Sequence, residues 1–288
     1  MEKAIHSSAR KGSIKETSIL MSEEIKFKKF QLVGLNGNEL GTVSIEHLWA
    51  DVFALKIKIL SVDGLCDLEK SIQEALDVAK RNRARIVMYR LIKGETASQE
   101  IGHLLLSFGF KKKNERIEFK KSVSELSNDE GSPLKWKTAN ELNLNPEGIA
   151  KILVQVSMSD PDTDPTDDPL QFIHDFLTDP VLTSGLECIH VGFFQEEVAA
   201  LTVVQRNPKT GWSRISYMGV VPRFRKQNLG NWVHRYSFTV MKKEGGLLYH
   251  GGTTSTNLGM IRLFESNGCA RFCEMVEWNF SVGSKVTG

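Results

Sequence analysis

The segment 218–232, with the sequence MGVVPRFRKQNLGNW, combines three features that together could bind an anion. A run of β-branched residues ends at Pro222, which has no N–H to continue strand pairing, and basic side chains follow from Arg223 to Lys226. Gly230 then opens an amphipathic segment typical of a helix. A strand, a turn and a helix N-terminus direct unpaired backbone N–H groups and the positive end of the helix dipole to one point. The pattern predicts a phosphate site, with a solvated basic turn as the alternative.

Two common phosphate-binding loops are excluded for this segment. No Gly-Lys-Ser/Thr follows, so it is not a Walker loop, and it lacks the G-x-G-x-x-G pattern of dinucleotide-binding loops.

The segment SDPDTDPTDDPLQ, residues 159–171, concentrates negative charge. Its aspartates would attract a cationic amine, although Asp and Pro are also ordinary loop residues, and Asp167 or Asp168 could cap the helix that follows. D-x-D-x-D is typical of a calcium loop, but Pro165 stands where that loop requires Gly and Gln171 where it requires Glu, so no calcium site is expected. The aspartates are Asp160, Asp162, Asp164, Asp167 and Asp168.

The four cysteines have no metal-binding pattern. They are Cys66, Cys188, Cys269 and Cys273, none forms C-x-x-C, and the last two have no His at zinc-like spacing. We therefore expect reduced, mostly buried thiols, no metal and a cytoplasmic protein.

Composition limits the function classes further. The chain has 288 residues, 41% hydrophobic and 25% charged, which favours two soluble globular domains. A net charge of +2 gives no bias toward nucleic acid or a membrane surface. No apolar run approaches the roughly 18–20 residues of a membrane helix. Residues 1–23 are polar, lack a secretory h-region, and are expected to be a flexible extension.

A Ser/Asn/Asp/Gly/Pro-rich stretch divides the chain. It predicts a linker at 123–132 between halves at 24–122 and 133–288. Alternation and helical spacing predict strand, strand, strand, helix, strand, helix, strand in the first half, and two helices, three strands, helix, strand, helix, strand in the second. The expected helices are 67–82, 97–108, 146–156, 170–177, 229–243 and 257–266. The expected strands are 25–34, 39–48, 51–60, 84–92, 115–123, 187–194, 197–206, 213–221, 247–252 and 272–282.

An internal repeat links the two halves. HLLLSFGFKKKNERIEFKKSV (103–123) aligns without a gap with RLFESNGCARFCEMVEWNFSV (262–282) at an offset of 159, and 7 of 21 columns are identical. The identities include Gly109 with Gly268 and Glu118 with Glu277. One helix–Gly–strand unit that occurs twice explains this match.

VVPRFRKQNLG resembles the acetyl-CoA pyrophosphate loop of the GCN5-related N-acetyltransferases, a strand followed by V-x-P-x-(aromatic)-R and x-x-G-x-G/A at the start of a helix. Val220, Pro222, Phe224, Arg225 and Gly230 occupy matching positions. Asn228 replaces the first motif glycine, and Asn tolerates positive φ better than other non-Gly residues.

STNLGMIRLFESNGC is similar to the following motif of that family, in which an Asn opens a helix that ends at a Gly. The resemblance places Asn257 near the pantetheine or phosphate end of the cofactor. Met260, Ile261, Leu263 and Phe264 are expected to be helix packing.

The resemblance implies a mixed α/β fold of two tandem acetyltransferase-like domains, each a mixed central sheet flanked by helices. It assigns acetyl-CoA to the second half, with the thioester carbonyl on the Met218 N–H. The first half has Asp63 and Asp67 where the loop would be, so it is expected to be a degenerate copy without a cofactor site. The implied contacts are Met218, Gly219, Val220, Arg225, Lys226, Gln227, Asn228, Leu229, Gly230 and Asn257.

The catalytic acid and base are less clear from the sequence. Phe264 stands where many members of the family carry Tyr, and Arg214 or Ser216 falls where some carry Glu. Tyr217 and His190 are the candidates, with a core position as the alternative for each and the favoured one for His190. Proton removal through ordered water is compatible with either.

The sequence therefore predicts an acetyl-CoA-dependent N-acetyltransferase. Its acceptor would be a small amine, with a cation favoured by the acidic segment, and it would act as a monomer or a homodimer. A non-enzymatic acyl-CoA-binding or regulatory protein of the same fold is the first alternative, and a two-domain interaction protein is the second.

Overall fold

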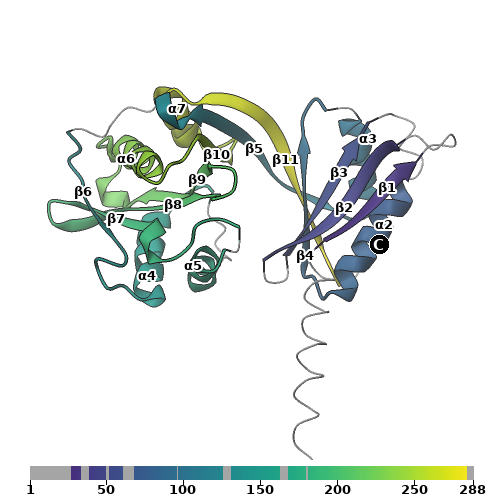
Figure 1. Cartoon of the computed structure of the whole chain (residues 1–288), viewed down its shortest axis with the longest axis horizontal. Coiled ribbons are helices and arrows are strands. Elements are labelled where there is room, and N and C mark those ends of the chain that lie inside the picture. The colour runs from purple at the N-terminus through teal and green to yellow at the C-terminus, as the bar shows by residue number, and fades with distance from the viewer. Residues whose placement is uncertain are drawn as a thin grey trace, which may run out of the picture. The chain divides into compact units, whose positions relative to one another are not determined.

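The computed structural model describes residues 27–33, 39–49, 52–60, 68–95, 97–125, 131–162, 168–179 and 181–283. It forms two compact units: a first unit of the residues up to Asn114 together with those from Met275, and a second unit of Glu115–Glu274. Each unit is a mixed sheet with helices against it, so the predicted fold class is confirmed (Figure 1). In the described part of the chain no helix is long and apolar enough to span a bilayer.

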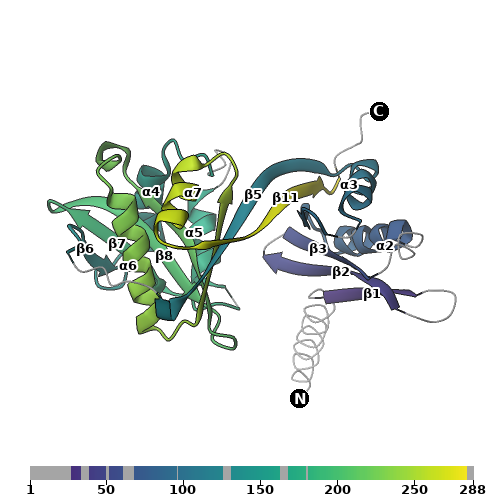
Figure 2. The same ribbon diagram turned by 90° about the horizontal axis from the view of Figure 1, so that it is seen from above.

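The sheet of the first unit has the order β1-β2-β3-β4-β11, antiparallel except for the β3–β4 pair. Helix α2 packs along this sheet, and α3 contacts β4 (Figure 2). The predicted apolar face of α2 is buried at Leu68, Ile72, Ala75, Leu76 and Ala79. The elements are β1 Phe27–Val33, β2 Glu39–Trp49, β3 Val52–Ile59, α2 Leu68–Arg81, β4 Ile86–Ile92, α3 Ser98–Ser107 and the last part of β11.

The sheet of the second unit has the order β5-β10-β9-β8-β7-β6, antiparallel except for the β9–β10 pair. Strand β6 was not predicted. It has four residues, Lys135–Thr138, and they alternate between exposed and partly buried positions. The strands are β5 Lys111–Ser122, β6 Lys135–Thr138, β7 Ile189–Phe194, β8 Glu197–Arg206, β9 Trp212–Val220, β10 Leu248–Thr254 and the first part of β11 Ala270–Ser281. The helices are α4 Pro146–Ser157, α5 Pro169–Leu177, α6 Leu229–Lys243 and α7 Leu258–Ser266.

Helices cover both faces of the second sheet, with α6 on one side and α4 and α5 on the other (Figure 1). Strand β8 is central, so it is apolar on both faces: Val203 packs with the α4 and α5 cluster, and Val204 packs with Phe238 of α6 and Tyr249. Phe264 is buried in the same cluster as Phe238, which confirms its predicted packing role.

The predicted helix–Gly–strand repeat is present. Helix α3, Gly109 and β5 correspond to α7, Gly268 and β11, and both glycines have positive φ, 85° and 70°. Lys111 and Ser122, the ends of β5, correspond at the offset of 159 to Ala270 and Ser281, the ends of β11.

The two repeats exchange these final strands. In the second unit β5 lies beside β10, with Ser122 opposite Leu248, and in the first unit β11 lies beside β4, with Ser281 opposite Ile86. Ser122 and Ser281 are equivalent in the repeat, so the two exchanged strands have the same register. The division between units therefore runs through β5 and β11, whereas composition predicted it at 123–132. Composition marks a polar connection, but it does not encode which sheet a strand joins.

Candidate functional site

Strands β9 and β10 separate soon after they begin. They pair only over the first two residues of each strand, up to Ser213 and Tyr249, so the rest of β9 faces a gap. A register shift in the β8–β9 pairing leaves Ser216 as an extra residue, a β-bulge. Bulges occur often beside functional sites because they redirect a strand.

The backbone of Met218 points into this gap. Val221 donates its N–H to the Ala199 carbonyl of β8 at 2.9 Å, and alternate residues of a strand direct their backbone groups to the same side. Met218 and Val220 therefore direct their backbone N–H and C=O groups away from β8. The Val220 carbonyl is consistent with this orientation, because it accepts a hydrogen bond at 2.8 Å from Arg225 Nε, which does not belong to β8. The N–H of Met218 is therefore directed into the gap.

The loop after β9 is a compact turn that leads into α6. A short 3₁₀ helix, Pro222–Phe224, buries the Phe224 ring, and α6 begins at Leu229. Lys226 and Asn228 both have left-handed backbone, with φ of 62° and 61°. The expectation that Asn would adopt positive φ in place of the motif glycine is confirmed.

Five consecutive backbone N–H groups of this loop, from Lys226 to Gly230, donate to no acceptor within the described residues. The side chain of Asn228, at the N-cap, does not cap the helix either. Lys226, Gln227 and Asn228 are exposed, so these donors are accessible. Unpaired N–H groups and the positive end of the α6 dipole together have the chemistry to bind an anion such as phosphate.

The side chain of Arg225 binds two backbone carbonyl groups. Its Nε donates to the Val220 carbonyl and its Nη2 donates to the Val156 carbonyl, at 2.8 and 2.9 Å. The guanidinium thereby ties the loop to the end of β9 and to the last turn of α4. This partner could not be predicted, because Val156 is 69 residues away in the chain.

Asn257 is the N-cap of α7 and lies 8% exposed. Its Oδ1 accepts from the Met260 N–H at 3.2 Å, and its Nδ2 donates to Asp162 at 3.1 Å. Asp162 also accepts from the Thr254 N–H at 3.1 Å and from the hydroxyls of Thr253 and Thr254. We call these contacts the Asp162 latch.

The Asp162 latch gives one residue of the acidic segment a structural role. Burial alone would raise the pKa of Asp162, but hydrogen bonds from Thr253, Thr254 and Asn257 outweigh it and lower the pKa. Asp168 caps α5 through the Leu170 N–H at 2.9 Å, as predicted for one of the two candidates. Asp164 and Asp167 lie outside the described residues, as do Asp63, Asp67 and Cys66.

Tyr217 lies on the α4 and α5 side of the sheet. Its ring meets Phe172 edge-to-face at 6.1 Å, and a Cβ at Gly219 would lie 2.7 Å from its hydroxyl. The hydroxyl is buried and has no hydrogen-bond partner. Burial, with a smaller contribution from Asp160, raises the pKa of Tyr217. A phenol with a raised pKa stays protonated at neutral pH, so it is present as a hydrogen-bond donor and not as a base.

His190 lies in the interior, 5% exposed, between β7 and α6. Its Nδ1 is 3.1 Å from the Tyr236 hydroxyl of α6, and its Nε2 is buried without a partner. Burial lowers the pKa of His190 to about 4, although Glu187 and Glu141 oppose the shift. This environment is that of a core histidine, the alternative that the sequence favoured.

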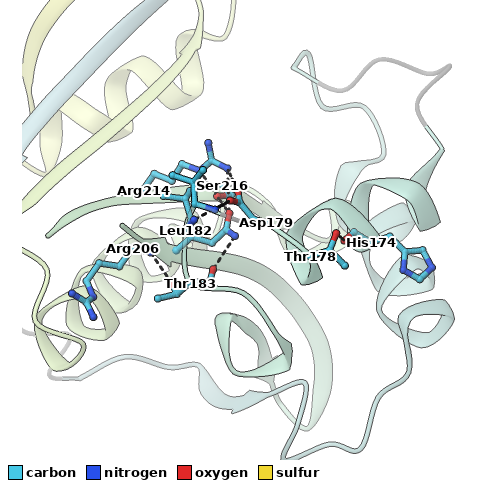
Figure 3. A network of polar contacts seen from close by, with 10 residues as sticks. His174, Thr178, Asp179, Leu182, Thr183, Arg206, Arg214 and Ser216 are labelled. Atoms are coloured by element: carbon cyan, nitrogen blue, oxygen red, sulfur yellow. Dashed lines mark hydrogen bonds and ion pairs between the residues drawn. The ribbon is translucent and has the colours of Figure 1, made fainter. Parts of the chain in front are cut away.

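Arg214 and Ser216, the β9 residues at the position where the resemblance led us to look for a Glu, belong to a polar cluster. Arg214 Nε donates to Ser216 Oγ at 2.7 Å, and its Nη2 lies 3.5 Å from Asp179 and 3.3 Å from Gln205 Oε1. Figure 3 shows Arg214, Ser216 and Asp179 gathered beside Leu182, whose N–H donates to Asp179. Strand β9 thus supplies a cation at this position, and its partner carboxylate comes from the segment after α5.

Among the described thiols, Cys188 and Cys269 are buried and Cys273 is partly exposed, and no disulfide joins them. The described residues also contain no cluster of His, Cys, Asp and Glu that could hold a metal ion.

The sequence matches no protein-family model and no curated protein. Solved structures, however, resemble this chain over most of its length. A GCN5-related N-acetyltransferase from Sphaerobacter thermophilus is 12% identical with a TM-score of 0.61, covering 88% of this chain and 80% of its own. One from Kribbella flavida is 11% identical with a TM-score of 0.59, covering 98% of both chains. A tandem protein of the same fold from the clavulanic acid biosynthesis pathway is 10% identical with a TM-score of 0.55, covering 90% and 84%.

The chain therefore has the fold of the GCN5-related N-acetyltransferases. At 10–12% identity these likenesses establish the architecture, so the chemistry has to be argued from the site itself.

Proposed function

We propose that the second unit binds acetyl-CoA and transfers its acetyl group to a small amine. The observation that carries this proposal is the run of five unpaired N–H groups from Lys226 to Gly230, the first three in exposed residues, at the start of α6 and beside the gap between β9 and β10. The run would hold the pyrophosphate, and the open edge of β9 would pair with the pantetheine arm as an added strand does.

The chemistry follows from the orientation of the strand. The Met218 N–H, directed into the gap, would donate to the thioester carbonyl and stabilise the oxyanion that forms when the amine attacks. The carbon–sulfur bond then breaks, CoA leaves as a thiolate that takes up a proton, and the amine nitrogen loses one. The buried Tyr217 hydroxyl, on the same strand and without a partner, is a candidate donor to the thiolate.

The amine would enter on the side of the sheet where α4 and α5 lie. The Asp162 latch and the Arg214–Asp179 pair both lie there, so the polar groups available to an acceptor belong to this face. A non-enzymatic acyl-CoA-binding protein of the same fold is the alternative, favoured by the absence of a carboxylate from β9 at Arg214 and Ser216.

Isothermal titration with acetyl-CoA tests the binding part. Asn228→Asp keeps the size and the tolerance of positive φ but places a negative charge among the five N–H groups, so the dissociation constant should rise at least about tenfold. Asn143→Asp is the matched control, because Asn143 is also exposed with φ of 51° but lies in the turn before α4.

Binding by the wild type and by Asn143→Asp, with weakened binding by Asn228→Asp, would support the loop as the phosphate site. Equal binding by all three proteins would contradict that assignment, and no binding by any of them would contradict the proposed function.

A further inference from the structure

Glu118 is a buried carboxylate beside the gap that the proposed reaction leaves without a role. It lies on β5, directly opposite Gly252 of β10, and is 9% exposed. A Cβ built on Gly252 would lie 2.3–2.4 Å from the Glu118 carboxyl atoms, so the carboxyl group rests against the bare backbone of β10. Only a glycine at 252 leaves room for it there.

The repeat provides an internal comparison for this carboxylate. Glu277 is the equivalent of Glu118, is also buried, and lies opposite Arg90 of β4 in the same register. Arg90 Nε donates to Glu277 at 3.4 Å across the strand pair. In the first unit the carboxylate is thus neutralised from the neighbouring strand, whereas in the second unit that strand offers Gly252 and no side chain.

Among the residues that the structure describes, Glu118 has one ion-pair partner, which lies on its own strand. Arg116 Nε is 3.5 Å from its Oε1, and the two side chains point to the same side of β5 because they are two residues apart. Arg116 thus pairs with the carboxylate along β5, and no side chain at Gly252 separates the carboxylate from the backbone of β10.

Glu118 lies on the face of the sheet from which the amine would enter. Its neighbours Ile117 and Phe119 pack into the cluster of α6 and α7, so Glu118 points to the opposite face, where α4 and α5 lie. Gly252 is beyond the last β9–β10 pair at Tyr249, and β10 is therefore the only strand between Glu118 and the gap.

The position of Glu118 along the strands is also close to that of the Met218 N–H. Counting forward from the Tyr249–Ser213 pair places Met218 level with Thr254, or with Thr253 when Ser216 is counted as the extra bulge residue. Glu118, opposite Gly252, is therefore one or two residues, about 3–7 Å along the strand, from the level of the N–H that would hold the thioester. An amine placed to attack there would lie over β10, within reach of this carboxylate.

We propose that Glu118 is the catalytic base of the second unit and accepts the proton of the attacking amine. This proposal rests on the proposed function. The amine nitrogen forms a bond to the thioester carbon, the carbon–sulfur bond breaks, and CoA leaves as a thiolate that is protonated to the thiol. The proton lost by the nitrogen passes to the Glu118 carboxylate and then to water.

The test compares Glu118→Gln with Glu277→Gln, the matched control from the other repeat. Each protein is titrated with acetyl-CoA and then assayed for CoA release and acetylated product with ethanolamine, putrescine, spermidine, glycine and tryptamine. Glu118→Gln should lower kcat at least about 100-fold for the amine that the wild type acetylates, with the acetyl-CoA dissociation constant changed less than about twofold. Glu277→Gln should keep the wild-type kcat, because its carboxylate is paired with Arg90.

A second variant covers the case in which Glu118→Gln does not fold. Glu118→Asp keeps the charge but withdraws it by one methylene, so it should retain acetyl-CoA binding and part of the lost kcat. If Glu118→Gln binds acetyl-CoA and keeps its kcat, Glu118 is not the base, and the proposed transferase stands. If the wild type binds acetyl-CoA but acetylates none of the amines, the transfer itself is overturned, and the role of Glu118 with it.

Discussion

The parallel strand pair differs between the two units in a way that locates the site. In the first unit β3 and β4 pair at four successive residues, from Val52 with Ile86 to Leu55 with Tyr89. In the second unit β9 and β10 pair at two and then separate. The two sheets share their strand order around this pair, so the longer opening is a property of the second sequence and not of the topology.

Particular residues account for the difference. Ser216 is a bulge in the β8–β9 pairing, whereas the shift recorded in the β2–β3 pairing lies at its His47–Trp49 end. Gly251 and Gly252 of β10 pair with the residues of β5 whose repeat equivalents in β11 pair with Tyr89 and Arg90 of β4. The two glycines therefore occupy the positions of Tyr89 and Arg90. Tyr89 is 4% exposed within the core of the first unit. A strand with side chains at these positions closes its sheet, and one with glycines leaves its backbone accessible.

The strand exchange is the feature whose disruption should have the largest effect. A fragment 133–288, cut at the linker that composition predicts, lacks β5 and leaves β10 without its antiparallel neighbour. It also loses Ile117, Phe119 and Val123 from the core around α6. We expect this fragment to show no cooperative thermal transition by circular dichroism.

A fragment 111–288 is the control, because it restores β5 and lacks only the remainder of the first unit. It should unfold cooperatively and keep acetyl-CoA binding. Equal melting curves for the two fragments would show that β5 is dispensable to the second unit, contrary to the exchange.

Secondary structure was predictable where the pattern is local. The predicted bounds of β8 and α6 match the structure, since β8 is continuously apolar and α6 follows a recognisable loop. Strand β6 was missed because four residues with alternating exposure carry too little pattern. The exchange was not predictable, because β5 and β11 have the same strand pattern whichever sheet they join.

The site was predictable only in its backbone. The left-handed conformation of Asn228 follows from residue type and motif position. The partners of Arg225 and Asp162 come from elements 69 to 95 residues away, so only the fold reveals them. Glu118 did leave a signal in the sequence, its identity with Glu277 in the repeat, but Gly252 opposite it could not be known without the register.

Acid should weaken the second unit through two buried histidines. Burial lowers the pKa of His190 to about 4 and that of His234 to about 3. Below pH 6.5 the unfolded chain binds protons at these rings and the folded unit does not, so stability falls as pH drops from 6.5 toward 4. The slope is up to about 1.4 kcal/mol per pH unit for each histidine.

Urea unfolding at pH 7 and pH 5 can be monitored by hydrogen exchange, which gives a separate unfolding midpoint for the peptides of each unit. The midpoint for the second unit should drop more, and His190→Asn should reduce that drop. His103→Asn is the control, since this side chain is exposed on α3 of the first unit. An undiminished drop in His190→Asn would assign the acid sensitivity to other groups.

The Asp162 latch should have the smallest effect, because its carboxylate is partly exposed. Asp162→Asn removes the charge that accepts hydrogen bonds from Thr253, Thr254 and Asn257, at an expected cost of about 1 kcal/mol at neutral pH. The lowered pKa of Asp162 means that this contribution is present above its unfolded pKa and is lost as pH falls through the folded value. The difference between wild type and variant should therefore vanish in strong acid.

Denaturant unfolding at pH 7 and pH 2.5 measures that difference, with Asp175→Asn as the control. Asp175 accepts a single exposed hydrogen bond from Gln171 on α5, so its loss should cost less than about 0.5 kcal/mol. A latch that matters to the site would also change acetyl-CoA affinity, because Asn257 and the end of β10 are positioned by Asp162. Equal stability and equal affinity in Asp162→Asn would mean that the end of β10 holds its position without the latch, and the gap would then depend on the bulge at Ser216 and the glycines alone.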